Sequence, residues 1–281
     1  HAAAAITTDT MGSTRIPAAF CGLVGLRPTY GELSRRGMAP ALRRVDSIGV
    51  IGRDVADLAP LLHVMAGYDP DDPRSRKRRV PLAPPDWEPG SLRLGVVNDL
   101  RSLGVADDVV VAFRQAIDQA DGALGAITPM SLDIAALEVA VSRRAALLLM
   151  EAEIVAGNRD RLPSASMDLK QMLGFARNKN AIDYAVADRR LDGHEIHVRR
   201  LFEHYDVLLM PTVPSYPPEF GAEAPANLAD FTALASLAGC PAISLPLPGG
   251  LGLQLVGDRG SDLRLCELAQ VLGSVLGAAE G

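Results

Sequence analysis

Apolar residues in the first quarter of the chain recur with the period of an α-helix. They follow Asp54, a good N-cap residue, at i, i+3, i+4 and i+7: Leu58, Leu61, Leu62 and Met65. Gly67 stands where a glycine commonly ends a helix. The pattern therefore predicts a helix between Asp54 and Gly67.

Similar helical patterns alternate with short apolar runs over the rest of the chain. Helices are predicted over residues 107–120, 133–156, 181–205, 228–238 and 261–276. Strands are predicted over residues 92–97, 206–210, 242–245 and 252–256. Strands separated by helices favour parallel neighbours, whereas the last two strands can pair antiparallel across the turn at 248–250. These elements predict an α/β fold with a mixed sheet.

One segment breaks the alternation. Residues 69–91 are rich in proline and charge and show no apolar periodicity, so we expect an exposed internal loop within a single domain over residues 1–281. The basic run RSRKRR at 74–79 lies in this loop behind three aspartates and without interleaved aromatic residues. That context is typical of a solvated loop rather than of a nucleic-acid surface.

The composition excludes several classes of protein. Apolar residues make up 48% of the 281 residues and charged residues 22%, which excludes a disordered chain. The formal net charge of −6 disfavours nucleic acid or an anionic membrane as a partner, and no apolar run approaches the roughly 20 residues that span a bilayer. The three cysteines are widely spaced, which excludes a disulfide framework or a thiolate zinc site and predicts a cytoplasmic location.

The candidate chemistry lies near the start of the chain. Ser13 follows the glycine-containing stretch Asp9, Thr10, Met11 and Gly12. Successive backbone N–H groups in such a stretch can converge on one point, and a serine beside them is what acyl transfer requires. Considered alone, a cluster of this kind is more often a simple turn.

The string DTMGSTRIPAAFCGLVGLRPTYG at 9–31 resembles the nucleophile end of the amidase signature family. Similarity continues through DSIG at 46–49, YDVLLMPTVP at 205–214 and ADFTALASLAGCPAISLPL at 229–247. The resemblance implies the fold of that family, a mixed, largely parallel twisted β-sheet covered by helices on both faces. It also implies that the N-terminal part of that fold is absent from this chain.

The resemblance assigns roles to the residues that match. It implies that Ser13 is the acyl-enzyme nucleophile and that the backbone N–H groups of Thr10, Met11, Gly12 and Ser13 form the oxyanion hole. Family members use a Ser, cis-Ser, Lys triad, in which a neutral lysine takes the proton through the bridging serine. No metal and no organic cofactor is expected.

The upstream part of the triad is missing from this sequence. The only lysines are Lys77, Lys170 and Lys179, which follow Ser13 in contexts that predict solvated surface. We therefore expect the chain alone to be inactive, as the C-terminal portion of a longer amidase, because removal of the base from a serine hydrolase costs several powers of ten in rate.

Two residues beside Ser13 leave alternatives open. Met11 stands where the family most often has glycine, so either the backbone there is ordinary or Met11 narrows the acyl pocket. Arg15 either binds a substrate carboxylate or supports the loop by pairing with Asp9; the supporting role is favoured because a buried arginine needs a partner.

Three functions remain on these grounds. The main hypothesis is an amidohydrolase that cleaves a small-molecule carboxamide through an ester of Ser13. The first alternative is the glutaminase-type A subunit of a tRNA-dependent amidotransferase, and the second is a non-catalytic binding protein that retains the fold. Beyond the substrate, the expected partners are a second copy of the chain or a missing N-terminal segment.

Overall fold

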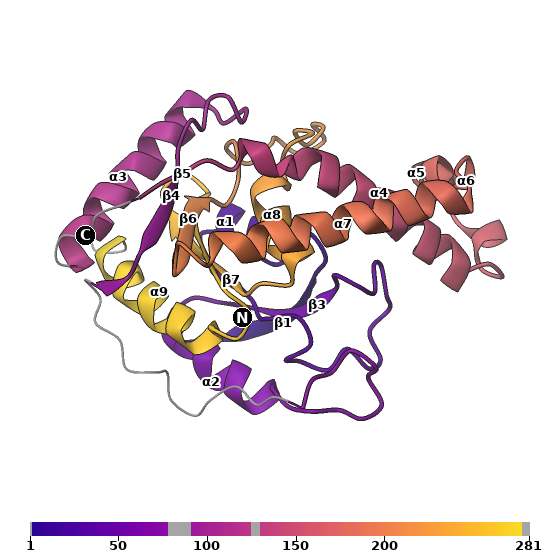
Figure 1. Ribbon diagram of the computed structural model, residues 1–281, viewed down its shortest axis with the longest axis horizontal. Helices are drawn as coiled ribbons and strands as arrows, with labels where there is room; N and C mark the ends of the chain where they lie inside the picture. The colour runs from indigo at the N-terminus through magenta and orange to yellow at the C-terminus, as the bar shows by residue number, and fades with distance from the viewer. Residues whose placement is uncertain (1, 78–90, 125–129, 277–281) are drawn as a thin grey trace.

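An eight-stranded sheet forms the centre of the computed structural model, which describes residues 2–77, 91–124 and 130–276 (Figure 1). The strand order is β1-β3-β2-β7-β8-β6-β4-β5. The strands are β1 (Ala4–Asp9), β2 (Val24–Arg27), β3 (Ser47–Gly52), β4 (Leu94–Val97), β5 (Met130–Leu132), β6 (Val207–Pro211), β7 (Ala242–Leu247) and β8 (Leu251–Gly257). The helices are α1 (Arg15–Phe20), α2 (Val55–Met65), α3 (Asp107–Leu124), α4 (Val139–Gly157), α5 (Met167–Met172), α6 (Gly174–Arg177), α7 (Ala181–Leu201), α8 (Asp230–Ala238) and α9 (Asp262–Leu276).

The sheet is mixed, as predicted, but parallel pairing takes a smaller share than expected. Within the described part of the chain, β4 pairs parallel with β5 and β6, and the other neighbouring strands pair antiparallel. Parallel neighbours need a crossover, which α3 supplies between β4 and β5. The remaining neighbours include the predicted hairpin of β7 and β8, which closes with Leu247 opposite Leu251.

Every helix and strand predicted from periodicity is present. The largest difference lies at the start of α4, where a 3₁₀ turn (Ala135–Leu137) and the left-handed residue Glu138 (φ 44°) precede the helix. Asp54 caps α2 by accepting a hydrogen bond from the Ala56 amide at 3.0 Å. Strands β1, β2, β3 and β5 and helices α1, α5 and α6 were not predicted.

The loop predicted at 69–91 is only partly exposed. Residues 78–90 lie outside the described residues. In the described part, Asp72 is buried and accepts hydrogen bonds from the amides of Arg35 and Arg74, each at 2.9 Å. The start of this segment is therefore fastened to the neighbouring loop through Asp72, whereas most of its other described residues are exposed.

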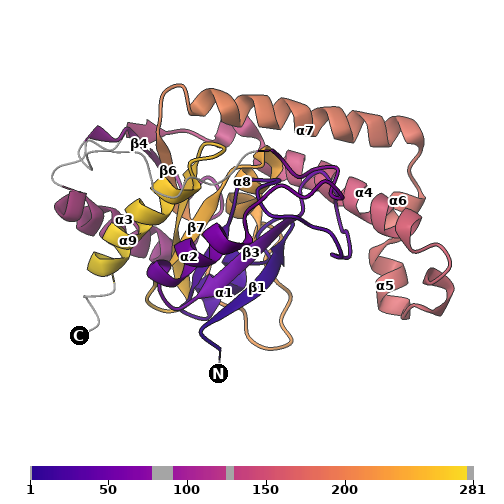
Figure 2. The same cartoon turned by 90° about the horizontal axis from the view of Figure 1, so that it is seen from below.

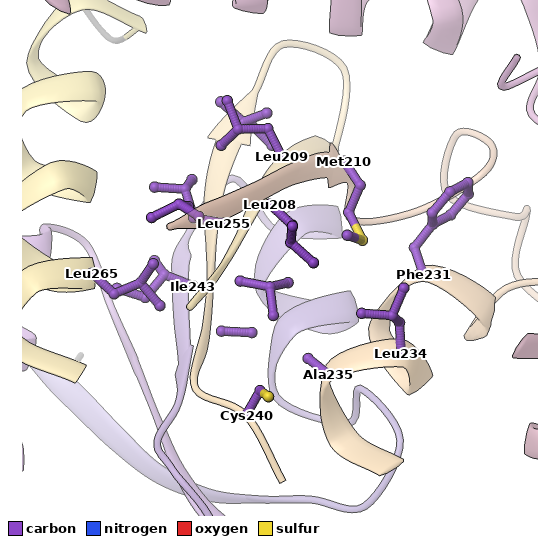
Figure 3. Packing of buried hydrophobic residues seen from close by; sticks show 14 of the residues in the cluster. Leu208, Leu209, Met210, Phe231, Leu234, Ala235, Cys240, Ile243, Leu255 and Leu265 are labelled. Atoms are coloured by element: carbon purple, nitrogen blue, oxygen red, sulfur yellow. The ribbon is translucent and has the colours of Figure 1, made fainter. Parts of the chain in front are cut away.

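Helices cover both faces of the sheet. Helices α2, α3 and α9 pack together on one face. Helices α1 and α8 cover the other face, and α4 and α7 pack on the outer side of α8. Leu265 of α9 points into the core from one side, and Phe231 and Leu234 of α8 point into it from the other (Figure 3). Between them lie buried side chains of the central strands, among them Ile243 of β7 and Leu255 of β8.

Two long helices extend beyond the sheet. Helices α4 and α7 run side by side toward α5 and α6 (Figure 2). Within the described ranges, no helix combines the length and the apolar character needed to cross a membrane.

Helix α1 lies directly on the sheet because small residues line the contact. Ala18 and Ala19 are completely buried, and α1 contacts β2, β7 and β8. A Cβ atom at Gly25 of β2 would lie 2.7 Å from the Ala18 Cβ, so this approach requires glycine. The close contact fixes where α1 begins, and Ser13 lies just before it.

Candidate active site

Ser13 lies in the tight turn that leads from β1 into α1. The turn spans residues 10–14, between Asp9 at the end of β1 and Arg15 at the start of α1. Ser13 is exposed, and its hydroxyl forms no hydrogen bond with any residue that the structure describes. The hydroxyl is therefore accessible for reaction.

Asp9 holds this turn in shape from inside the protein. Its side chain is completely buried, and it accepts hydrogen bonds from the amides of Gly12 at 2.8 Å and Thr14 at 3.3 Å. One carboxylate thus binds the backbone on both sides of Ser13. A buried charge is stable only when it is paired and hydrogen-bonded. The turn supplies hydrogen bonds to the Asp9 carboxylate but no positive charge.

Arg15 supplies the main counter-charge. Its Nε donates to Asp9 Oδ2 and its Nη2 to Asp9 Oδ1, each at 3.0 Å, in a two-pronged ion pair. Its Nη1 donates to Gln254 Oε1 at 2.6 Å and to the Thr232 carbonyl at 3.0 Å. Arg15 is completely buried and its donors are occupied by the protein, so of the two roles considered above the geometry fits loop support.

Arg27 of β2 is a second buried cation on the same carboxylate. Its Nη1 donates to the Asp9 carbonyl and lies 3.2 Å from Asp9 Oδ1, while Nη2 donates to the Val45 carbonyl at 2.6 Å. Burial lowers the pKa of Arg27 to about 10 although Asp9 acts against it. Burial alone would raise the pKa of Asp9, but the charges of Arg15 and Arg27 outweigh it and hold that pKa well below its usual value.

The amide of Gly12 is removed from the predicted oxyanion hole by this arrangement. Because it donates to Asp9 Oδ1, it is not free to meet a substrate oxygen. The amides of Thr10, Met11 and Ser13 donate to no acceptor among the described residues. The four donors suggested by the resemblance are therefore reduced to these three candidates.

Position 12 requires a glycine, because of both its backbone conformation and its close neighbours. Its φ is +130°, and a Cβ atom there would lie 2.2 Å from Thr232 Oγ1 and 2.9 Å from Ile16 Cδ1. The Thr232 hydroxyl in turn donates to the Met11 carbonyl at 2.7 Å. Met11 is not among the described residues with positive φ, so of the two possibilities above its backbone is ordinary. Helix α8 thus contacts the turn through Thr232.

The side chain of Thr10 is also fixed. Its hydroxyl donates to Asp46 Oδ1 at 2.7 Å, and Asp46 Oδ2 accepts from the amides of Ala41 and Leu42 at 2.8 and 2.9 Å. Burial raises the pKa of Asp46, although these hydrogen bonds oppose the shift. The loop that precedes β3 therefore also holds the turn, through Asp46.

The supporting residues that sequence reasoning missed include Arg27, Thr232 and Gln254. Arg27 lies in the quoted motif, and an arginine in an otherwise apolar run, VGLR, is a signal that could have found it. Thr232 and Gln254 are more than 200 positions from Arg15 and carry no local signal.

The three lysines lie away from this turn. Lys77 Nζ is 5.4 Å from the centre of the Tyr68 ring, Lys170 donates to the Pro163 carbonyl at 2.8 Å, and Lys179 lies 5.1 Å from the Phe175 ring. Two of the three sit on or beside α5 and α6, at the far end of α4 and α7 (Figure 1). Within the described residues, no group of three His, Cys, Asp or Glu side chains is placed to hold a metal ion.

The sequence matches a known family over nearly its whole length. A family model described as Amidase matches residues 1–266. The A subunit of glutamyl-tRNA(Gln) amidotransferase from Rubrobacter xylanophilus is 35% identical, with 95% of this chain and 63% of that protein covered. The protein of the same name from Neisseria meningitidis is 32% identical, with 94% and 62% covered.

Solved structures show the same relationship. The A subunit of glutamyl-tRNA(Gln) amidotransferase from Thermotoga maritima superposes with a TM-score of 0.80 at 26% identity, covering 96% of this chain and 62% of that one. A 6-aminohexanoate cyclic dimer hydrolase complexed with substrate superposes with a TM-score of 0.78 at 26% identity, covering 98% and 64%. The chain spans less than two thirds of the length of these relatives.

Replacement of Gly12 tests whether Thr232 and the turn are packed as described. Gly12→Ala is expected to lower the free energy of unfolding by about 1–3 kcal/mol more than Gly22→Ala, because overpacking adds to backbone strain. Gly22 is the matched control, since its φ is +65° and nothing lies within 4 Å of its Cβ position. Urea unfolding measures both variants, and equal losses would contradict the packing of Thr232 on Gly12.

The pH dependence of stability tests the charge on Asp9. Because its pKa is depressed in the folded state, the unfolded chain takes up a proton first as the pH falls, so the stabilisation present at neutral pH is lost below about pH 4. Asp9→Asn is expected to cost about 3–5 kcal/mol at neutral pH, since it leaves two buried arginines without their carboxylate.

The difference in stability between wild type and Asp9→Asn should shrink as the pH falls below about 4. Asp57→Asn, on the exposed side of α2, is the control with the same chemical change. A difference between wild type and Asp9→Asn that stays constant from neutral to acidic pH would show that the Asp9 charge does not hold the turn.

Proposed function

The chain belongs to the amidase signature family, and from this premise we propose that Ser13 is the nucleophile of an amidohydrolase. The observation that supports the proposal is the exposed Ser13 hydroxyl, without a hydrogen-bond partner in the described residues, beside a turn whose backbone is held by Asp9. A nucleophile on a rigid support loses little entropy on reaching its attack geometry.

In the proposed reaction, Ser13 Oγ attacks the carbonyl carbon of a carboxamide and loses its proton to a base. The resulting oxyanion accepts hydrogen bonds from amides among Thr10, Met11 and Ser13, which are in place before the charge develops. The C–N bond then breaks, and ammonia or an amine leaves with a proton. Water cleaves the Ser13 ester and returns the proton to Oγ.

The base is not one of the lysines of this chain. Lys77, Lys170 and Lys179 are occupied elsewhere, as described above. We therefore propose that the Ser, cis-Ser, Lys triad of the family operates here with a bridging serine and a lysine from outside these 281 residues. By itself the chain is then expected to react slowly, because only binding and the oxyanion donors remain.

The comparisons favour the A subunit of a tRNA-dependent amidotransferase over a free-standing amidase, which reverses the order expected from the sequence. The curated relatives named above carry that name at 32–35% identity. We therefore propose this form of the amidohydrolase ahead of a free-standing amidase. It implies a complex with further subunits, in the cytoplasm that the three cysteines predict. A small-molecule amide remains the proposed substrate of Ser13 in both candidates.

A fluorophosphonate probe distinguishes an enzyme from a non-catalytic protein that retains the fold. The protein at its native length is expected to take up one probe molecule per chain and to lose labelling in Ser13→Ala. Ser164→Ala is the control, because Ser164 is also exposed and only donates to the Arg161 carbonyl. Labelling that persists in Ser13→Ala, or no labelling of the wild type, would contradict the proposal.

Ammonia release distinguishes the two enzyme hypotheses. At its native length, the amidotransferase candidate is expected to hydrolyse glutamine at a rate that rises when its partner subunits are added. A free-standing amidase of native length instead releases ammonia from simple amides at full rate without a partner subunit. A coupled ammonia assay with both substrates measures this difference. Full activity on simple amides and none on glutamine would exclude the amidotransferase candidate.

A further inference from the structure

A charged cavity lies between α7, the end of α4 and the loops around Tyr30 and Arg74. It is a half-open cavity of about 460 Å³, a size typical of small-molecule sites, and its lining is dominated by arginines and carboxylates. The lining contains neither Ser13 nor any residue of its turn. The cavity is therefore separate from the candidate active site.

Each of the four carboxylates of the lining pairs with an arginine, but three arginines serve all four, because Arg44 pairs with two of them. Arg43 Nε lies 3.2 Å from Glu153, and Arg259 Nη1 lies 2.9 Å from Glu195. Arg44 pairs with both Asp188 and Asp192 of α7. These ion pairs fix the walls of the cavity and use three of its five arginines.

Arg74 and Arg76 are the two arginines that remain. Neither forms an ion pair with any carboxylate in the described ranges. Their backbone is nevertheless held, because the Arg74 amide donates to Asp72 at 2.9 Å and the Arg76 amide to the Gly31 carbonyl at 3.2 Å. An anchored segment thus carries two guanidinium groups that line the cavity and that no carboxylate of the described residues neutralises.

Two tyrosines form neutral parts of the wall. The Tyr30 hydroxyl donates to the Arg43 carbonyl at 2.6 Å, which ties the ring to the loop that carries Arg43. Tyr184 stands on α7 beside Glu153, and both rings line the cavity. The wall thus contains two aromatic rings, of which the Tyr30 ring is fixed by its hydrogen bond.

We propose that this cavity binds a small organic anion with two negatively charged groups, phosphate or carboxylate, through Arg74 and Arg76. Guanidinium groups bind both kinds of group in a two-pronged geometry, and two such groups match a doubly charged ligand. Five arginines against four carboxylates leave the lining with one net positive charge on a chain of net charge −6, so a small anion that contacts Arg74 and Arg76 is favoured over a polyanion that would also meet the acidic surface.

The basic run at 74–79 thereby receives a different interpretation. The sequence predicted a solvated loop, and Arg74 and Lys77 are indeed exposed, but Arg76 is half-buried and both Arg74 and Arg76 line the cavity. Residues 78 and 79 of the run lie outside the described residues and take no part in the proposal.

Calorimetric titration with inorganic pyrophosphate and with citrate tests the site and distinguishes phosphate from carboxylate ligands. The wild type is expected to bind at least one of them at one site per chain, more weakly as salt is added. The double variant Arg74→Gln/Arg76→Gln should bind that probe about tenfold more weakly or not at all. Arg53→Gln/Arg159→Gln is the matched control, since it removes the same charge from two exposed arginines outside the cavity.

Three results would overturn the proposal. The first is no saturable binding of either probe by the wild type, and the second is the same loss of affinity in both double variants. The third is binding of a structured RNA that is tighter than binding of either probe and that both double variants weaken equally. The last result would indicate a diffuse basic surface instead of an anion pocket. A melting temperature of the Arg74→Gln/Arg76→Gln variant equal to that of the wild type without ligand establishes that lost binding is not lost folding.

Discussion

The structure around Ser13 depends on the buried carboxylate of Asp9. It ends strand β1, binds the amides of Gly12 and Thr14 on either side of the serine, and is itself held by Arg15 and Arg27. A buried charge is tolerated only with counter-charges and hydrogen bonds in good geometry, so the carboxylate, the arginines and the turn form one unit. Loss of any part leaves an unpaired charge in the core.

This unit connects the start of the chain with its last quarter. Arg15 donates to Gln254 of β8 and to the Thr232 carbonyl of α8, and the Thr232 hydroxyl donates to Met11 beside the serine. A turn of a few residues would otherwise sample many conformations, at a cost of about 1–2 kcal/mol per residue to order. The fixed position of Ser13 is therefore a property of the folded sheet and its helices rather than of the local sequence.

The sequence predicts the long helices and the central strands where the apolar pattern is clear, as in the helical period of α3 and the continuous apolar run of β6. It misses β1 because that strand is largely exposed and its apolar residues are consecutive instead of alternating, and β2 because Gly25 and Arg27 leave only two apolar side chains in it. The pairing of Asp9 with Arg15 can be predicted from the sequence because the two residues are six positions apart. The hydrogen bond from the Gly12 amide to Asp9 cannot be predicted, since a glycine in a turn does not reveal which acceptor its N–H will meet.

A crystal structure of the protein after reaction with a fluorophosphonate tests the central claim most directly, because the phosphonyl oxygen imitates the oxyanion. We expect that oxygen within hydrogen-bond distance of at least two amides among Thr10, Met11 and Ser13, while the Gly12 amide stays on Asp9. An adduct whose oxygen points to solvent, or a Gly12 amide that has left Asp9 to bind it, would contradict the account.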